Sequence, residues 1–210
     1  PVVLTTSQPN LIAVNASLPA NNLQELLALL LAHPGKYNFA SVGNGSSSHL
    51  CMEYIKALSS TFAVHIPFNG GPPAVLATVG GETHMIAAVP TLLTPQIKAG
   101  RLKAIAVTGL QRYGLTPEVP TVSDSGEPSL KGFEAIAWNG VLVAAATPRP
   151  LVERINAAIN LALQDESVRQ RLQAAGLEPA GGTPEKFAQL MRDESANWLP
   201  IIRRSGATLG

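Results

Sequence analysis

Strand-like and helix-like stretches alternate along the middle of this 210-residue chain. Short apolar runs predict strands, and segments whose apolar residues recur every three or four positions predict helices. This alternation is typical of a mostly parallel sheet covered by helices, and ligands of such sheets bind at the carboxyl ends of the strands. The expected strands cover residues 36–40, 62–66, 84–89 and 102–107, and the expected helices cover 50–59, 74–79 and 94–99.

A glycine- and serine-rich stretch, residues 41–50, joins the strand at 36–40 to the helix after it. The first N–H groups of a helix lack partners within the helix, and the helix dipole is positive there. Gly43 and Gly45 let the backbone approach a ligand closely because they have no Cβ. The serines at 46–48 add hydroxyls and can cap the helix. The stretch therefore predicts a carboxylate or phosphate cradle; the alternative is a glycine-rich loop with a serine cap and no ligand.

A second glycine turn, residues 69–71, follows the strand at 62–66 and lies at a second carboxyl end. Glu53 is the only acid between residues 34 and 81, so a site built there would be neutral to mildly positive. Such a site would bind an anion through backbone N–H groups, hydroxyls and the amides of Asn44 and Asn69. The alternative for this turn alone is an ordinary tight turn.

Composition argues against several other classes of function. The formal net charge is +1 and the basic residues are scattered, so nothing indicates nucleic acid binding. The single cysteine, Cys51, excludes an internal disulfide, and its place on the apolar face of a helix predicts a buried structural thiol. No apolar run reaches the roughly 18 residues of a membrane span. The four histidines are far apart and have no carboxylate cluster beside them, so no metal and no cofactor are expected.

Enzyme motifs are also incomplete. Gly43 and Gly45 with Ser48 only approach the dinucleotide fingerprint, and no acid follows at the distance that would hold a ribose. The phosphate-loop tripeptide and the nucleophile elbow are missing, and His49 has no obvious acidic partner. We therefore expect a protein that binds a ligand without catalysing a reaction.

The two ends of the chain predict a different organisation. Strands are expected at 2–5 and 11–14, a helix capped by Asn21 or Asn22 at 23–31, a connecting segment at 111–132 and a long strand at 133–146. Helices are expected from Thr147, at 167–175 and from Thr183, with Pro200 kinking or breaking the last one. These helices need a surface to cover, which either the strands at both ends of this tail or a partner would supply.

Six motifs, in order and with matching spacing, resemble the substrate-binding proteins of tripartite tricarboxylate transporters, also called Bug receptors. The resemblance implies a periplasmic two-lobed protein that closes on a small carboxylate and delivers it to the membrane components of the transporter. It implies a fold similar to type II periplasmic binding proteins, with one complete lobe built on a parallel or mixed sheet and an incomplete first lobe. The motifs are YNFASVGNGSSSHL at 37–50, HIPFNGGPPA at 65–74, GGE at 80–82, IKAGRLKAIAVT at 97–108, PEVPTV at 117–122 and GGTPE at 181–185.

The resemblance also assigns parts of this chain. Residues 1–14 would be a crossover segment, 15–125 the second ligand-binding lobe, and 126–210 a crossover strand with helices of the first lobe. A signal peptide and half of the first lobe would be missing, as in an N-terminally truncated member. The residues that match the family's ligand loops are Ser41, Gly43, Asn44, Gly45, Ser46, Ser47, His49, Phe68, Asn69 and Gly70.

Two further expectations follow. Residues 85–90 lack the Asp-Asn pair that the family often carries there, which predicts plain carboxylates rather than amino acids as ligands. The alternative function is a non-binding remnant that forms a homodimer through its exposed first-lobe surface, because uncovered apolar surface tends to find a partner.

Overall fold

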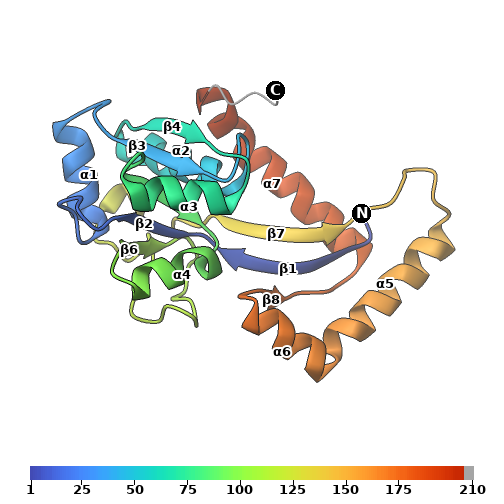
Figure 1. Cartoon of the computed structure of the whole chain (residues 1–210). Helices are drawn as coiled ribbons and strands as arrows, with labels where there is room; N and C mark the ends of the chain where they lie inside the picture. The colour runs from blue at the N-terminus through green and yellow to red at the C-terminus, as the bar shows by residue number, and fades with distance from the viewer. Residues whose placement is uncertain (206–210) are drawn as a thin grey trace. The chain divides into compact units, whose positions relative to one another are not determined.

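The computed structural model describes residues 1–205, which form two compact units (Figure 1). The first unit combines Pro1–Gln8 with Ala137–Pro200, and the second combines Pro9–Ile136 with the described residues 201–205. The sequence had predicted the divisions between the parts of the chain after residues 14 and 125, whereas the units divide after residues 8 and 136. They differ because the strand after Asn10 pairs within the second unit's sheet, and residues 126–136 also group with that unit.

The second unit contains a five-stranded sheet with the order β4-β3-β5-β2-β6. Its strands are β2 (Leu11–Asn15), β3 (Asn38–Ser41), β4 (Val64–Pro67), β5 (Met85–Ala88) and β6 (Leu102–Val107). Its helices are α1 (Leu23–Ala32), α2 (Ser47–Ser59), α3 (Gly71–Gly80) and α4 (Pro90–Lys98), with a short 3₁₀ helix, η1 (Pro128–Leu130). The expected alternation of strand and helix is therefore confirmed for this part of the chain.

The sheet is mixed rather than mostly parallel. Strand β3 runs parallel to β4 and β5, whereas β2 runs antiparallel to β5 and β6. The parallel strands are joined by helical crossovers, as parallel pairing requires. Strand β2 follows directly on a strand of the other sheet, so no crossover within this sheet sets its direction.

Side-chain caps start α1 and α2 at residues that the sequence predicted as caps. The Asn22 side chain accepts from the Glu25 N–H at the start of α1, and the Ser46 side chain accepts from the His49 N–H at the start of α2. Gly81 ends α3 with φ +81°, in the left-handed region that glycine adopts readily. Cys51 is fully buried on α2, which confirms the prediction of a buried thiol.

Strands β2 and β5 lie at the centre of this unit's core, and almost every residue in them is buried. Their apolar side chains pack with residues of β6, α3 and α4. A rigid sheet of this kind holds the loops at the carboxyl ends of its strands in fixed positions.

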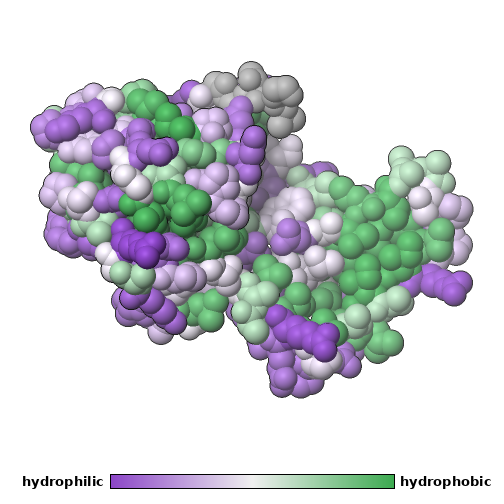
Figure 2. Space-filling model, in the orientation of Figure 1, coloured by the Kyte–Doolittle hydropathy of each residue, from purple (hydrophilic) through white to green (hydrophobic). Residues whose placement is uncertain are grey.

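The first unit has a three-stranded sheet with the order β7-β1-β8 and three helices. Its elements are β1 (Val3–Pro9), β7 (Ile136–Val141), α5 (Arg149–Gln164), α6 (Glu166–Ala174), β8 (Glu178–Pro179) and α7 (Pro184–Ser205). Phe187 of α7 is buried, packs edge-on against Trp138, and occupies the space beside Gly140 that a Cβ there would fill. Hydrophobic residues lie on the surface over α5 (Figure 2), where Leu161 is 71% exposed.

Three expectations for this unit need correction. The strand expected at 133–146 is shorter, because the chain leaves the sheet after Val141. Thr147 does not cap α5, which begins at Arg149 with Pro148 at its N-cap position. Pro200 does not break the last helix, since α7 continues to Ser205, and the alternative of a kink there stays a prediction. In the part of the chain that the structure describes, no helix combines the length and the apolar character that crossing a membrane requires.

Candidate ligand site

Two glycine-containing loops meet at the carboxyl ends of β3 and β4. The first connects β3 to α2 and the second connects β4 to α3. The loops are joined by backbone hydrogen bonds: the Phe68 N–H donates to Ser41 O over 3.1 Å, and the Gly70 N–H donates to Val42 O over 3.2 Å. The neighbouring parallel strands thus bring both predicted loops to one edge of the sheet.

A cavity of about 210 Å³ lies at this edge. The start of α2, the start of α3, the end of β5 and the first turn of α4 each contribute to its wall, and a residue before β2 completes it. No charged side chain lines the cavity. The lining residues are Asn10, Val42, Ser47, Ser48, Gly70, Gly71, Ala88, Val89 and Leu92. Ser47 and Gly70 are therefore the two predicted residues that line it.

The amides of the first loop are largely used within the loop. The Gly43 N–H donates to the Ser41 hydroxyl at 3.2 Å, the Gly45 N–H to His49 Nδ1 at 3.1 Å, and the Ser46 N–H to Gly43 O at 3.3 Å. These three N–H groups, which the sequence predicted as ligand contacts, are instead bonded within the loop. They fix the shape of the loop, because the Ser41 and His49 side chains and the Gly43 carbonyl accept their hydrogen bonds.

The three serines of the loop have separate roles. Ser46 caps α2 and its hydroxyl donates to Gly43 O at 2.6 Å. Ser48 is buried, and its hydroxyl accepts from the Val42 N–H at 3.0 Å while also lying 2.9 Å from the Ser46 hydroxyl. Ser47 lines the cavity and hydrogen-bonds to no described residue through its hydroxyl or its first-turn N–H. Of the three, Ser47 is therefore the serine available to a ligand.

The start of α3 provides a second available donor. Gly71 lines the cavity as the first residue of α3, and its N–H has no acceptor among residues 1–205. Pro72 and Pro73 follow and have no N–H groups, so Gly71 is the one residue among the first three of α3 with a backbone N–H group. Two helix N-termini, with their positive dipole ends, therefore meet at one uncharged cavity.

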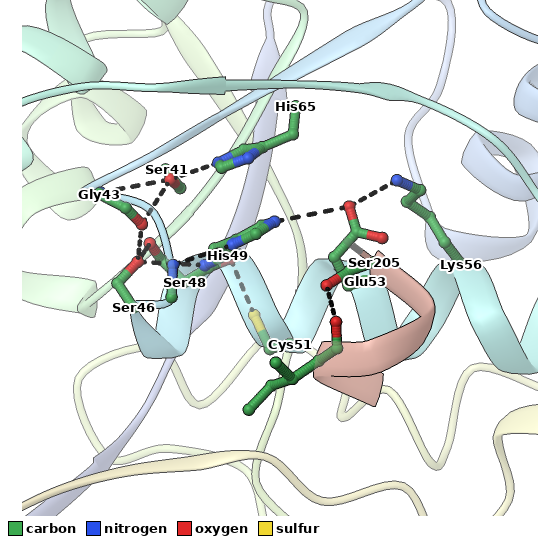
Figure 3. A network of polar contacts seen from close by, with 12 residues as sticks. Ser41, Gly43, Ser46, Ser48, His49, Cys51, Glu53, Lys56, His65 and Ser205 are labelled. Atoms are coloured by element: carbon green, nitrogen blue, oxygen red, sulfur yellow. Dashed lines mark hydrogen bonds and ion pairs between the residues drawn. The ribbon is translucent and has the colours of Figure 1, made fainter. Parts of the chain in front are cut away.

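A stack of two histidines lies behind the first loop (Figure 3). The His49 and His65 rings are 3.6 Å apart between centroids and nearly parallel, and His65 Nε2 lies 2.6 Å from the Ser41 hydroxyl. Burial lowers the pKa of His65 to about 4, with the charges of His49 and Lys56 acting in the same direction. Burial also lowers the pKa of His49, although nearby Glu53 opposes that change. Both rings are therefore neutral near pH 7.

The remaining predicted residues lie beside the cavity without lining it. Ser41 is fully buried, so its hydroxyl serves the loop and His65 rather than a bound molecule. Asn44 and Asn69 are exposed, and Phe68 packs against the core. A larger cavity of about 350 Å³ borders the amino-terminal end of β4, where Phe62, Val64 and His65 contribute to its wall.

The sequence reasoning missed several lining residues. Asn10, between β1 and β2, is 1% exposed, and its side-chain Nδ2 has no hydrogen-bond partner within the described residues. An asparagine directly before the apolar strand Leu11–Asn15 was the available signal, but only the sheet pairing brings it to the loops. Val42, Ser48 and Gly71 fall within the two predicted glycine stretches but were not assigned as ligand contacts, and the other missed residues are Ala88, Val89 and Leu92.

The sequence of the chain also matches a known protein family. Residues 1–207 match the model of the tripartite tricarboxylate transporter family receptor, TctC. The chain belongs to this receptor family. The resemblance inferred from the six motifs is thereby confirmed.

Relatives of this TctC-family chain include curated proteins and solved structures. A protein from the tcbD-tcbE intergenic region of Pseudomonas sp. is 37% identical over 96% of this chain and 60% of its own length. Bordetella pertussis BugT is 31% identical over 100% of this chain and 63% of its own length. The chain thus spans about 60% of the length of these curated relatives.

Solved TctC and Bug structures share the fold. An R. palustris protein solved with adipate superposes with a TM-score of 0.87 at 27% identity, covering 99% of this chain and 69% of that one. MatC from Rhodopseudomonas palustris, solved with malate, gives 0.82 at 29% identity over 96% and 69%. The periplasmic binding protein BugD gives 0.85 at 28% identity over 99% and 69%. The expected periplasmic binding protein fold is confirmed.

Proposed function

We propose that this TctC-family chain binds a small di- or tricarboxylate as a periplasmic receptor and presents it to the membrane components of a tripartite transporter. The cavity at the starts of α2 and α3 carries the proposal, because it offers hydrogen-bond donors to an anion and no carboxylate that would repel one. Family membership supports it, as do the relatives solved with adipate and malate.

The size of the cavity also favours a small ligand. About 210 Å³ is below the range of roughly 300–1,000 Å³ that is usual for drug-sized ligands. A short aliphatic acid, or one end of a longer one, suits such a space. The apolar side chains of Val42, Val89 and Leu92 would contact its carbon chain, and the donors at Ser47 and Gly71 would contact its carboxylate.

The wall contributed by β5 favours plain carboxylates over amino acids. Ala88 and Val89 stand at its carboxyl end, and no acid lines the cavity that could pair with an ammonium group. An amino acid would have to lose water from its charged amino group without gaining a partner, which is unfavourable in a partly enclosed site.

Isothermal titration calorimetry tests the proposal directly. The protein is titrated with succinate, malate, adipate and citrate, and with aspartate and glutamate for comparison. We expect saturable binding of at least one plain acid and weaker binding of the amino acids. If none of the acids binds, the receptor function fails; if aspartate or glutamate binds more tightly than succinate or citrate, the ligand preference fails.

A further inference from the structure

A buried asparagine, Asn10, lines the cavity, and its side-chain donor has no hydrogen-bond partner in the described chain. We propose that the Asn10 side-chain amide donates a hydrogen bond to the carboxylate of the bound ligand, which makes Asn10 a binding residue of this site. The class of ligand rests on the proposed receptor function, whereas the role of Asn10 follows from its own surroundings.

The backbone of Asn10 is held in place on both sides. Its N–H donates to the Thr108 hydroxyl at 2.8 Å, and its carbonyl accepts from the Thr108 N–H at 3.0 Å. The Thr108 hydroxyl in turn donates to Ala135 O at 2.6 Å. All of these groups are buried, so the side chain of Asn10 starts from a fixed point at the cavity wall.

The side chain itself is left without a partner. Asn10 is 1% exposed, yet its Nδ2 makes no hydrogen bond to any residue between 1 and 205. Buried polar groups are nearly always hydrogen-bonded, and an unpaired one in a native protein calls for a specific explanation. Since Asn10 lines the cavity, a ligand oxygen there can supply the acceptor.

The other available groups at the cavity agree with an anionic acceptor. Ser47 and Gly71 also present donors without partners in the described chain, each at the first residue of a helix. A carboxylate has two oxygens and accepts several hydrogen bonds at once. Three donors from three separate segments therefore match one carboxylate group.

Calorimetry on two matched variants tests the inference. Asn10→Leu keeps a similar shape and removes the unpaired donor, so we expect an unchanged or higher melting temperature and affinities for malate, succinate and adipate about 10- to 100-fold weaker. Asn38→Leu is the control: Asn38 begins β3, at the opposite end from the cavity, and its side chain bonds Glu82 O and the His84 N–H. We expect this variant to lose thermal stability and keep its affinity.

Amide NMR of the unmodified protein gives a readout that does not depend on how the variants fold. The side-chain NH₂ resonances of Asn10, assigned by their loss in Asn10→Leu or Asn10→Ser, are expected to shift on addition of malate. Unchanged affinity in Asn10→Leu, or resonances that stay in place while malate binds, would overturn the role of Asn10 and leave the receptor function intact. If no plain acid binds the unmodified protein, both proposals fail.

Discussion

The two stacked histidines behind the ligand loop are uncharged at neutral pH because protonation would place charge in a buried site. His65 also contacts the Ser41 hydroxyl, which in turn accepts from the Gly43 N–H. The first loop is thus linked through the Ser41 hydroxyl to the His65 ring. Protonation of both rings would place two like charges side by side, because the ring centroids are only 3.6 Å apart.

This arrangement predicts acid sensitivity in a defined range. An unfolded histidine has a pKa near 6.5, whereas folding lowers the pKa of His65 to about 4. Below about pH 6.5 the unfolded chain therefore binds more protons, and the free energy of unfolding falls as the pH drops toward 4. Urea denaturation between about pH 7.5 and pH 5 is expected to show this decline, and His65→Gln is expected to flatten it.

Exposed His33 provides the control for that experiment. His33→Gln is expected to leave the decline as it is in the unmodified protein. A decline of equal steepness in His65→Gln would mean that other groups cause the acid sensitivity.

Substitutions of the neighbouring residues Ser46 and Ser47 are expected to affect different properties, the first the stability of the protein and the second its ligand binding. Ser46→Ala removes the cap of α2 and is expected to lower the free energy of unfolding by about 1 kcal/mol. Ser47→Ala removes a hydroxyl that faces the cavity and bonds to no described group, so it is expected to weaken malate binding several-fold with little change in stability. Urea denaturation and calorimetry on both variants check this. A loss of affinity in Ser46→Ala together with a loss of stability in Ser47→Ala would contradict the roles assigned to the two residues.

At the scale of elements, the sequence predicted those strand bounds and helix caps that are set by neighbouring residues. Strand β6 falls at its expected bounds, and Asn22 and Ser46 cap their helices as expected. The direction of β2 and the position of Asn10 were not predictable, since both depend on pairing with distant strands. The loop after β3 was predictable as a glycine turn, but its internal bonds arise from side chains folding back on it, which composition does not reveal.

Two glycines of helix α3 make a matched pair for the next prediction. A Cβ on Gly71 would clash with Leu92 Cδ1, so Gly71→Ala has to displace a side chain that lines the cavity. A Cβ on Gly80 would meet nothing within 4 Å. We expect Gly71→Ala to weaken binding of malate or adipate about tenfold or more by changing the cavity.

Gly80→Ala, near the other end of α3, is expected to leave binding unchanged and to raise the free energy of unfolding by up to about 1 kcal/mol, because alanine favours a helix more than glycine does. Calorimetry and urea denaturation on both variants measure the two quantities. Equal affinities in the two variants would show that the space beside Leu92 has no part in binding.

At the scale of the whole molecule, burial is uneven between the two units. Every residue of β5 is buried, and four of the five in β2 are. In the first unit, Leu163 is the one buried residue of α5, and α6 has none. The sequence indicated this imbalance, since the tail supplies amphipathic helices with few strands. The sequences of α5 and α6 do not specify which surface covers their apolar faces. Self-association of the chain through these two helices therefore stays a prediction.

Hydrogen–deuterium exchange can test both the difference in burial between the two units and the self-association of the chain. Local opening is easiest where few apolar contacts are buried, so amides of α5 and α6 are expected to exchange well before those of β2 and β5. The measurement is made at a low and at a high protein concentration. Exchange in α5 that stays fast at both would argue against a homodimer through this face. Slower exchange confined to α5 at the high concentration would indicate that a second copy covers exposed residues such as Leu151 and Leu161. Protection of α5 and α6 equal to that of β5 at both concentrations would contradict the expectation drawn from their burial.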